Sequence, residues 1–174
     1  TFVSIDGVLY NKTAKLLVAA SMVKEEIVVP EWVTAIGSFA FNGSSVKSID
    51  LPDGIERVGM NAFSQARNLE SINLPSATYI GESAFYECNS LKSVAFGNSL
   101  EDIGTKTFYN CYNLTNVIIP SSTNNIADDA FTGVRNIMWE GHSTSNTYGA
   151  YSINGFVDGD FVYFDDKKGT IYSY

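Results

Sequence analysis

The sequence predicts a solenoid of α/β-type repeats, in which short parallel strands stack and short helical turns or irregular segments lie opposite them. A phrase of the type Ile-Gly-x-x-Ala-Phe occurs five times, beginning at residues 36, 58, 80, 103 and 126. Successive copies are therefore 22, 22, 23 and 23 residues apart, and each is followed by an apolar LxxLxL-type stretch. A fixed period of this length indicates units that bury their apolar face only by stacking on their neighbours.

The first segment, residues 1–26, is predicted to be an N-terminal β-hairpin cap. Two β-favouring runs, 2–10 and 16–20, flank a polar turn at 11–15, which is a hairpin signal. A solenoid needs such a cap because an uncovered terminal unit would expose its core and its unpaired strand edges.

The repeat array is predicted at residues 27–139, with about five repeats. Alternation within each LxxLxL strand sends the fourth and sixth positions inward and the third and fifth outward. Ile, Ala and Phe of the anchor phrase are spaced i, i+4 and i+5, and one helical turn would place them on one face. Their phenylalanines should form the spine of the core: Phe41, Phe63, Phe85, Phe108 and Phe131. Because Ala127 replaces the glycine of the last anchor, a positive φ is not required there.

The last segment, residues 140–174, is predicted to be a polar loop followed by a C-terminal β-hairpin. Residues 140–155 are polar and contain glycine, and the run 161–172 resembles the first hairpin in composition. This hairpin would close the array or begin another one.

Cys88 and Cys111 occupy equivalent positions, three residues after the anchor phenylalanine. Ser44 and Ala66 fill the same position in earlier repeats, which indicates that a small buried residue is needed there, and free Cys behaves as a small hydrophobe. A disulfide is the alternative, because stacked positions about 4.8 Å apart lie within bridging range.

Composition and charge exclude several functions. The net charge of −8 and the pI near 4.5 argue against nucleic acid and anionic membranes as partners. No apolar run approaches the roughly 20 residues of a membrane span. The single histidine, His142, lies in a polar stretch, so we expect neither a catalytic site nor a zinc site. The paired carboxylates lack the spacing of a calcium loop and are expected to lie in turns. We therefore expect no enzyme activity, no metal and no cofactor.

The ends of the chain also carry expectations. Residue 1 is Thr and no signal sequence follows it, so any export signal should lie upstream. The strand-like end at 170–174 suggests that the natural chain continues.

The remaining candidate site is the outward surface of the strands. The fifth-position row changes from polar to apolar along the array: Val28, Asp50, Asn73, Ala95, Ile118 and Met138. The third-position row is small and uncharged: Ser48, Ser71, Ser93, Asn116 and Asn136. The candidate partner-binding residues here are Ala95, Asn116, Ile118, Asn136 and Met138, since an apolar patch with a polar rim is typical of a recognition surface. Alternatively, the C-terminal hairpin and the loop at 140–155 cover this patch as a cap.

A second candidate is the cluster Tyr86, Tyr109 and Tyr112. The first two follow the anchor phenylalanine in adjacent repeats and should stand side by side. Neighbouring tyrosines can stack a sugar or anchor a protein partner. They can equally cover the flank of the core.

The anchor phrase, the small residue or Cys after it, the LxxLxL strand and the closing Pro together resemble BspA-like leucine-rich repeats, of the treponemal leucine-rich repeat class. The resemblance covers about residues 2–139 and implies a leucine-rich repeat solenoid. It also implies a surface-exposed or secreted bacterial protein, since some members are adhesins for host matrix proteins or other bacteria. It implies no site residues, because no ligand residues are common to the family.

The function expected from these observations is a non-enzymatic bacterial protein-interaction module, extracellular or at the cell surface, that adheres to host or bacterial proteins through its strand face. The alternatives are a structural spacer that displays another domain, or carbohydrate binding through the tyrosine cluster.

Overall fold

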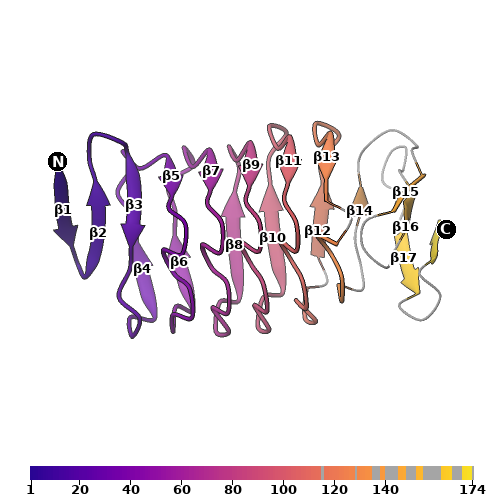
Figure 1. Ribbon diagram of the computed structural model, residues 1–174, viewed down its shortest axis with the longest axis horizontal. Helices are drawn as coiled ribbons and strands as arrows, with labels where there is room; N and C mark the ends of the chain where they lie inside the picture. The colour runs from indigo at the N-terminus through magenta and orange to yellow at the C-terminus, as the bar shows by residue number, and fades with distance from the viewer. Residues whose placement is uncertain are drawn as a thin grey trace.

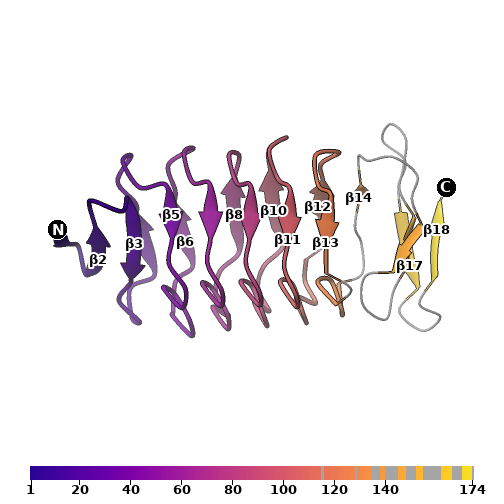
Figure 2. The ribbon, with the colours of Figure 1, turned by 45° about the horizontal axis from the view of Figure 1, so that its top comes forward.

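The fold is a stack of short strands along one long axis, from the N-terminus (indigo) to the C-terminus (yellow) in Figures 1 and 2. The computed structural model describes residues 1–114, 116–127 and 129–134, and beyond them the segments 138–139, 145–147, 152–154, 162–165 and 170–173. Equivalent strands of successive repeats lie side by side and pair in parallel. The predicted solenoid is confirmed.

The front wall is built from the LxxLxL strands. It comprises β4 (Glu26–Val28), β6 (Ser48–Asp50), β8 (Ser71–Leu74), β10 (Ser93–Phe96), β12 (Asn116–Ile119) and β14 (Met138–Trp139). Strands β8, β10, β12 and β14 form one hydrogen-bonded sheet, and β4 and β6 form another. Within the larger sheet, Val94 lies beside both Ile72 and Val117. The fourth position of each of these three strands is buried, as the alternation predicts, so the third and fifth positions form outward rows.

A second sheet, which we call the back sheet, was not predicted. It comprises β1 (Phe2–Ile5), β2 (Val8–Asn11), β3 (Leu16–Ala19), β5 (Ala35–Ile36), β7 (Arg57–Val58), β9 (Tyr79–Ile80), β11 (Asp102–Ile103) and β13 (Asn125–Ile126). Its two-residue strands contain the first residue of each anchor phrase, which points into the core. The N-terminal strands β1, β2 and β3 pair antiparallel and extend this sheet.

The anchor phrase does not form the helical turn that its spacing suggested. None of the described residues is helical, and consecutive turns follow each back-sheet strand. The third residue after the strand has positive φ, as Asn61 (54°) and Ser83 (53°) illustrate, and a right-handed helix excludes that conformation. The turns instead bond to the next repeat, with the Phe63 N–H donating to the Ala84 carbonyl at 2.7 Å. The sequence predicted either short helical turns or irregular segments opposite the front strands, and at the anchor phrase the structure has the irregular segments.

The anchor phenylalanines form a continuous column inside the stack. Each ring is almost fully buried, and adjacent centroids lie 4.7 to 5.2 Å apart. The interplanar angle is 2° for both neighbours of Phe85, within the distance range of favourable aromatic pairs. The predicted spine of the core is confirmed.

The anchor glycines serve close packing of the backbone. Gly81 has no positive φ, but a Cβ placed on it would lie 2.8 Å from the Gly59 carbonyl carbon. Glycine is needed where one backbone passes this close to another. The expectation that this position does not require a positive φ is confirmed, since neither Gly81 nor Ala127 has one.

Cys88 and Cys111 are free and buried, so the thiol alternative holds and the disulfide does not. Each Sγ donates to the carbonyl of the anchor phenylalanine one repeat earlier, Phe63 and Phe85 respectively, at 3.0 Å. Burial raises the pKa of the Cys88 thiol well above its ordinary value and that of Cys111 to about 12. Neither thiol is a nucleophile at neutral pH.

The C-terminal part contains two antiparallel strand pairs. β15 (Ser145–Thr147) pairs with β16 (Ser152–Asn154), and β17 (Val162–Asp165) pairs with β18 (Thr170–Ser173). The first pair lies within the stretch predicted as a loop, because polar composition does not prevent a short antiparallel pairing. The predicted loop at 140–144, with His142, lies outside the described residues. Whether this part covers the front wall stays a prediction.

Candidate functional site

The fifth-position row of the front wall faces solvent as predicted. Val28 is 74% exposed and Ile118 is 42% exposed, and Asp50, Asn73 and Ala95 are exposed between them. The register places Ala95 beside Asn73 and Ile118 beside Met138. Ala95 and Ile118 each directly follow the paired residues Val94 and Val117, so they lie on the same outward face.

The third-position row lies beside it and is small and uncharged in the described part. Ser48 and Ser71 are exposed, and Ser93 is half-buried and pairs with Asn116. The side chains of Asn116 and Met138, and Asn136 as a whole, lie outside the described residues. The structure thus brings Ala95 and Ile118 together on one face and leaves the contacts of these three side chains undescribed.

Sequence reasoning missed a column of alternating charge along the edge of this face. The second strand position carries Glu25, Lys47, Glu70 and Lys92 in successive repeats. The Lys47 Nζ lies 3.5 Å from the Glu25 carboxylate, and the Lys92 Nζ lies 2.8 Å from that of Glu70. The signal is present in the sequence, because the charge at the second strand position alternates from repeat to repeat.

Pairing within this charge column changes the pKa of one of its carboxyl groups. The hydrogen bond from Lys92, together with the nearby ammonium charge, lowers the pKa of the Glu70 carboxyl. All four groups are exposed or at the surface, so each pair contributes little to stability. The four groups form a fixed pattern of charge beside the uncharged rows. In general, such a pattern helps to orient a binding partner more than it raises affinity.

The tyrosine cluster is formed as predicted in its position. The rings of Tyr86 and Tyr109 stack with centroids 5.3 Å apart and planes 6° from parallel, and Tyr112 is 52% exposed nearby. Burial and the neighbouring Glu87 carboxylate raise the pKa of the Tyr86 phenol. Both stacked residues are half-buried, so each keeps part of its surface accessible to solvent.

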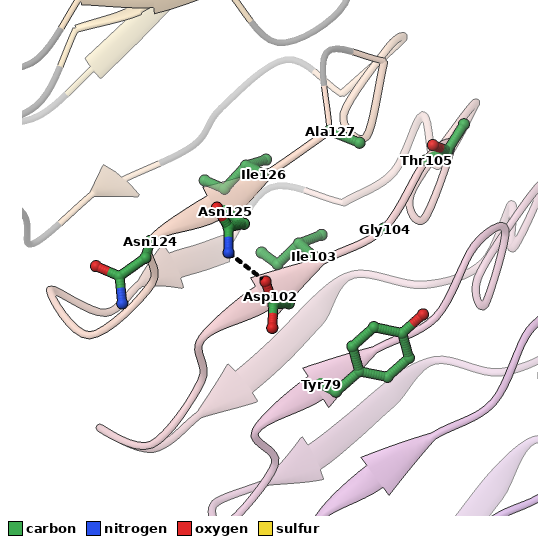
Figure 3. Close-up of a pocket in the computed structure, with 9 residues that line it drawn as sticks. All are labelled: Tyr79, Asp102, Ile103, Gly104, Thr105, Asn124, Asn125, Ile126 and Ala127. Atoms are coloured by element: carbon green, nitrogen blue, oxygen red, sulfur yellow. Dashed lines mark hydrogen bonds between the residues drawn. The ribbon is translucent and has the colours of Figure 1, made fainter.

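A shallow hollow on the back sheet is a third candidate that sequence reasoning did not find (Figure 3). It has a volume of about 430 Å³ and lies over β9, β11 and β13. Side chains from three strands meet there, because the residue before the buried position of each strand points outward. Tyr79, Asp102 and Asn125 occupy that position in adjacent strands.

Two kinds of feature were sought among the described residues, a cluster of metal ligands and a membrane-spanning helix. Across the described part of the chain, no three His, Cys, Asp or Glu side chains gather closely enough to hold a metal ion. Within the same residues no helix is long and apolar enough to cross a membrane.

Comparison with known proteins agrees with this architecture. The family model for the BspA type leucine-rich repeat region matches residues 20–138 in six copies. No curated protein sequence matches the chain at a significant level. Six copies exceed the five anchors by one, in agreement with the six strands of the front wall.

Solved structures of bacterial repeat proteins share the fold. The pneumococcal vaccine antigen PcpA is 26% identical with a TM-score of 0.67, over 79% of this chain and 39% of PcpA. A leucine-rich repeat protein of T. pallidum is 25% identical with a TM-score of 0.64, over 70% of this chain and 62% of its own. A leucine-rich repeat protein from Eubacterium ventriosum, at 19% identity and a TM-score of 0.61, matches 98% of this chain. The chain thus spans less than two thirds of the first two proteins that it matches.

Proposed function

Because the chain belongs to the BspA-type leucine-rich repeat family, we propose that it is a non-enzymatic protein-interaction module of a secreted or surface-exposed bacterial protein. The partner is a host matrix protein or another bacterial surface protein, and adhesion is the outcome. The similarity to PcpA, a pneumococcal vaccine antigen, supports a location at the cell surface or outside the cell.

One observation carries the proposal: the outward face of the front wall combines uncharged rows, an exposed apolar end at Ile118 and a bordering column of paired charges. Patches with an apolar centre and a polar rim are typical of recognition surfaces. The rigid stack holds these side chains in fixed positions, which reduces the entropy lost on binding.

The proposal is tested by placing charge on the front wall. In the double variant Ala95→Asp and Ile118→Asp, two new carboxylates lie in the apolar end of the row. We expect binding to immobilised collagen, laminin or fibronectin, whichever the unmodified chain binds, to weaken at least about tenfold, because a buried unpaired charge costs several kcal/mol at an interface. Surface plasmon resonance gives the dissociation constants.

The matched control carries the same charge change elsewhere. Ala14 and Ser38 are exposed in turns next to strands of the back sheet, so Ala14→Asp with Ser38→Asp should leave binding unchanged. Equal binding by both folded double variants would remove the front wall from consideration. Absence of any protein ligand in a pull-down with this chain would favour the structural spacer instead.

Carbohydrate binding through the tyrosine cluster is the second candidate, and the stacking of Tyr86 on Tyr109 favours it. The C–H bonds of a sugar pack against the face of an aromatic ring, and the two half-buried tyrosines keep part of their surface accessible. A glycan-array signal that disappears in Tyr109→Ala and persists in the front-wall double variant would place a sugar at this cluster.

A further inference from the structure

Small residues follow the buried position of two of the strands under the hollow. They are Gly104 after β11 and Ala127 after β13, and both line the hollow. Between β7 and β9 the Arg57 guanidinium instead lies over the Tyr79 ring, 4.8 Å from its centroid. The space over β11 and β13 stays open between Tyr79, Thr105 and Asn124.

The polar centre of the hollow is a carboxylate–amide pair. The Asn125 Nδ2 donates to Asp102 Oδ1 at 2.6 Å, and the bond spans two adjacent strands (Figure 3). The carboxylate keeps further acceptor sites, while the amide keeps a second N–H and its carbonyl oxygen. Donors and acceptors at this spacing suit vicinal hydroxyl groups, each of which both donates and accepts a hydrogen bond.

The rim of the hollow adds one aromatic ring and two further polar side chains. Arg57 covers one side of Tyr79 and restricts the ring's orientation, as a cation over an aromatic face does. Asn124 and Thr105 are exposed at the rim and can hydrogen-bond additional hydroxyl groups. An aromatic ring beside converging polar groups on a rigid scaffold is the arrangement expected of a small-ligand site.

The charges of the hollow narrow the ligand class. None of the nine described residues that line it is Lys, Arg or His, and Asp102 contributes a negative charge. Together with the net charge of −8, this disfavours phosphorylated, sulfated or sialylated ligands. We propose that the hollow over β9, β11 and β13 binds a neutral saccharide, with Asp102 and Asn125 holding its hydroxyl groups and Tyr79 flanking its ring. This site is separate from the front wall and from the tyrosine cluster.

The test uses the full chain on an array of neutral glycans (galactosides, α-glucans, mannosides and N-acetylglucosamine oligomers) and acidic glycans (sialylated and sulfated). We expect signals from neutral glycans. The variants Asp102→Ala and Asn125→Asp should weaken binding of the strongest soluble neutral glycan about tenfold or more, since each removes one side of a charge-assisted pair. Isothermal titration calorimetry measures the change.

The matched control is Asp53→Ala, because it removes an exposed carboxylate from a turn outside the hollow and should leave this binding intact. Where a variant does not fold, amide chemical shifts of the unmodified chain replace it, and shifts on glycan addition should be confined to residues 79, 102–105 and 124–127. The proposal is overturned by signals from acidic glycans only, by no glycan signal, by unchanged affinity in folded Asp102→Ala, or by shifts located elsewhere. Loss of the signal in Tyr109→Ala alone would assign the sugar to the tyrosine cluster.

Discussion

At the scale of single residues, the anchor phenylalanine contributes most to the stack. Phe85 is fully buried and stacks on Phe63 and Phe108 at 5.2 Å on both sides. Its ring therefore joins three repeats, and burial and aromatic contact both favour the folded state. This role could be predicted from sequence, because one residue type recurs at one position of every repeat.

The variant Phe85→Ala should lower the free energy of unfolding by about 3–5 kcal/mol, because it leaves a cavity between two rings. Urea denaturation followed by circular dichroism measures this change. Phe39→Ala makes the same substitution at an exposed position and should cost less than about 1 kcal/mol. Equal losses in the two variants would contradict the central place of the column.

The buried thiols predict a specific dependence of stability on pH. The pKa of Cys111 is about 12 in the folded chain against an ordinary value of 9.0, so the folded state binds the proton more tightly than the unfolded state. The resulting stabilisation is complete below pH 9 and disappears as the pH rises from 9 toward 12. The loss of stability over this range should therefore be smaller in Cys111→Ala, as measured by urea denaturation at several pH values. An identical pH dependence in both proteins would contradict the burial of this thiol.

At the scale of elements, the sequence predicted the front strands better than the segments opposite them. The alternation of apolar and polar residues in LxxLxL has one structural solution, with two outward rows. The spacing of Ile, Ala and Phe in the anchor is compatible with at least two structures, since both a helical turn and consecutive turns direct these residues inward. The positive φ at Asn61 and Ser83 decides between them, and neither residue type requires it.

The charge column gives a prediction at this scale, because it couples neighbouring strands. Replacing Lys92 by Ala removes the hydrogen bond to Glu70, so the pKa of the Glu70 carboxyl should return toward its ordinary value. Carboxyl carbon chemical shifts measured during an acid titration report this pKa directly. Exchanging Lys12 for Ala, far from this pair in the N-terminal turn, is the control. An unchanged Glu70 titration in Lys92→Ala would show that the pair does not form in solution.

At the scale of the whole molecule, the repeat fixes which positions lie in rows, and this made the solenoid predictable. The composition of a row does not by itself show which surface binds. The hollow over the back sheet was missed because it depends on Tyr79, Asp102 and Asn125 meeting across strands of two residues, and such short strands give no periodic signal. The charge column does have a periodic signal, since the charge at the second strand position alternates from repeat to repeat.

The most direct test of the account asks which wall a protein partner covers. Hydrogen–deuterium exchange of the chain, alone and with the matrix protein that it binds most tightly, measures this for every peptide. The account predicts slower exchange in β8, β10 and β12 of the front wall and unchanged exchange in β7 and β9 of the back sheet. Protection of the back sheet with an unaffected front wall would contradict it.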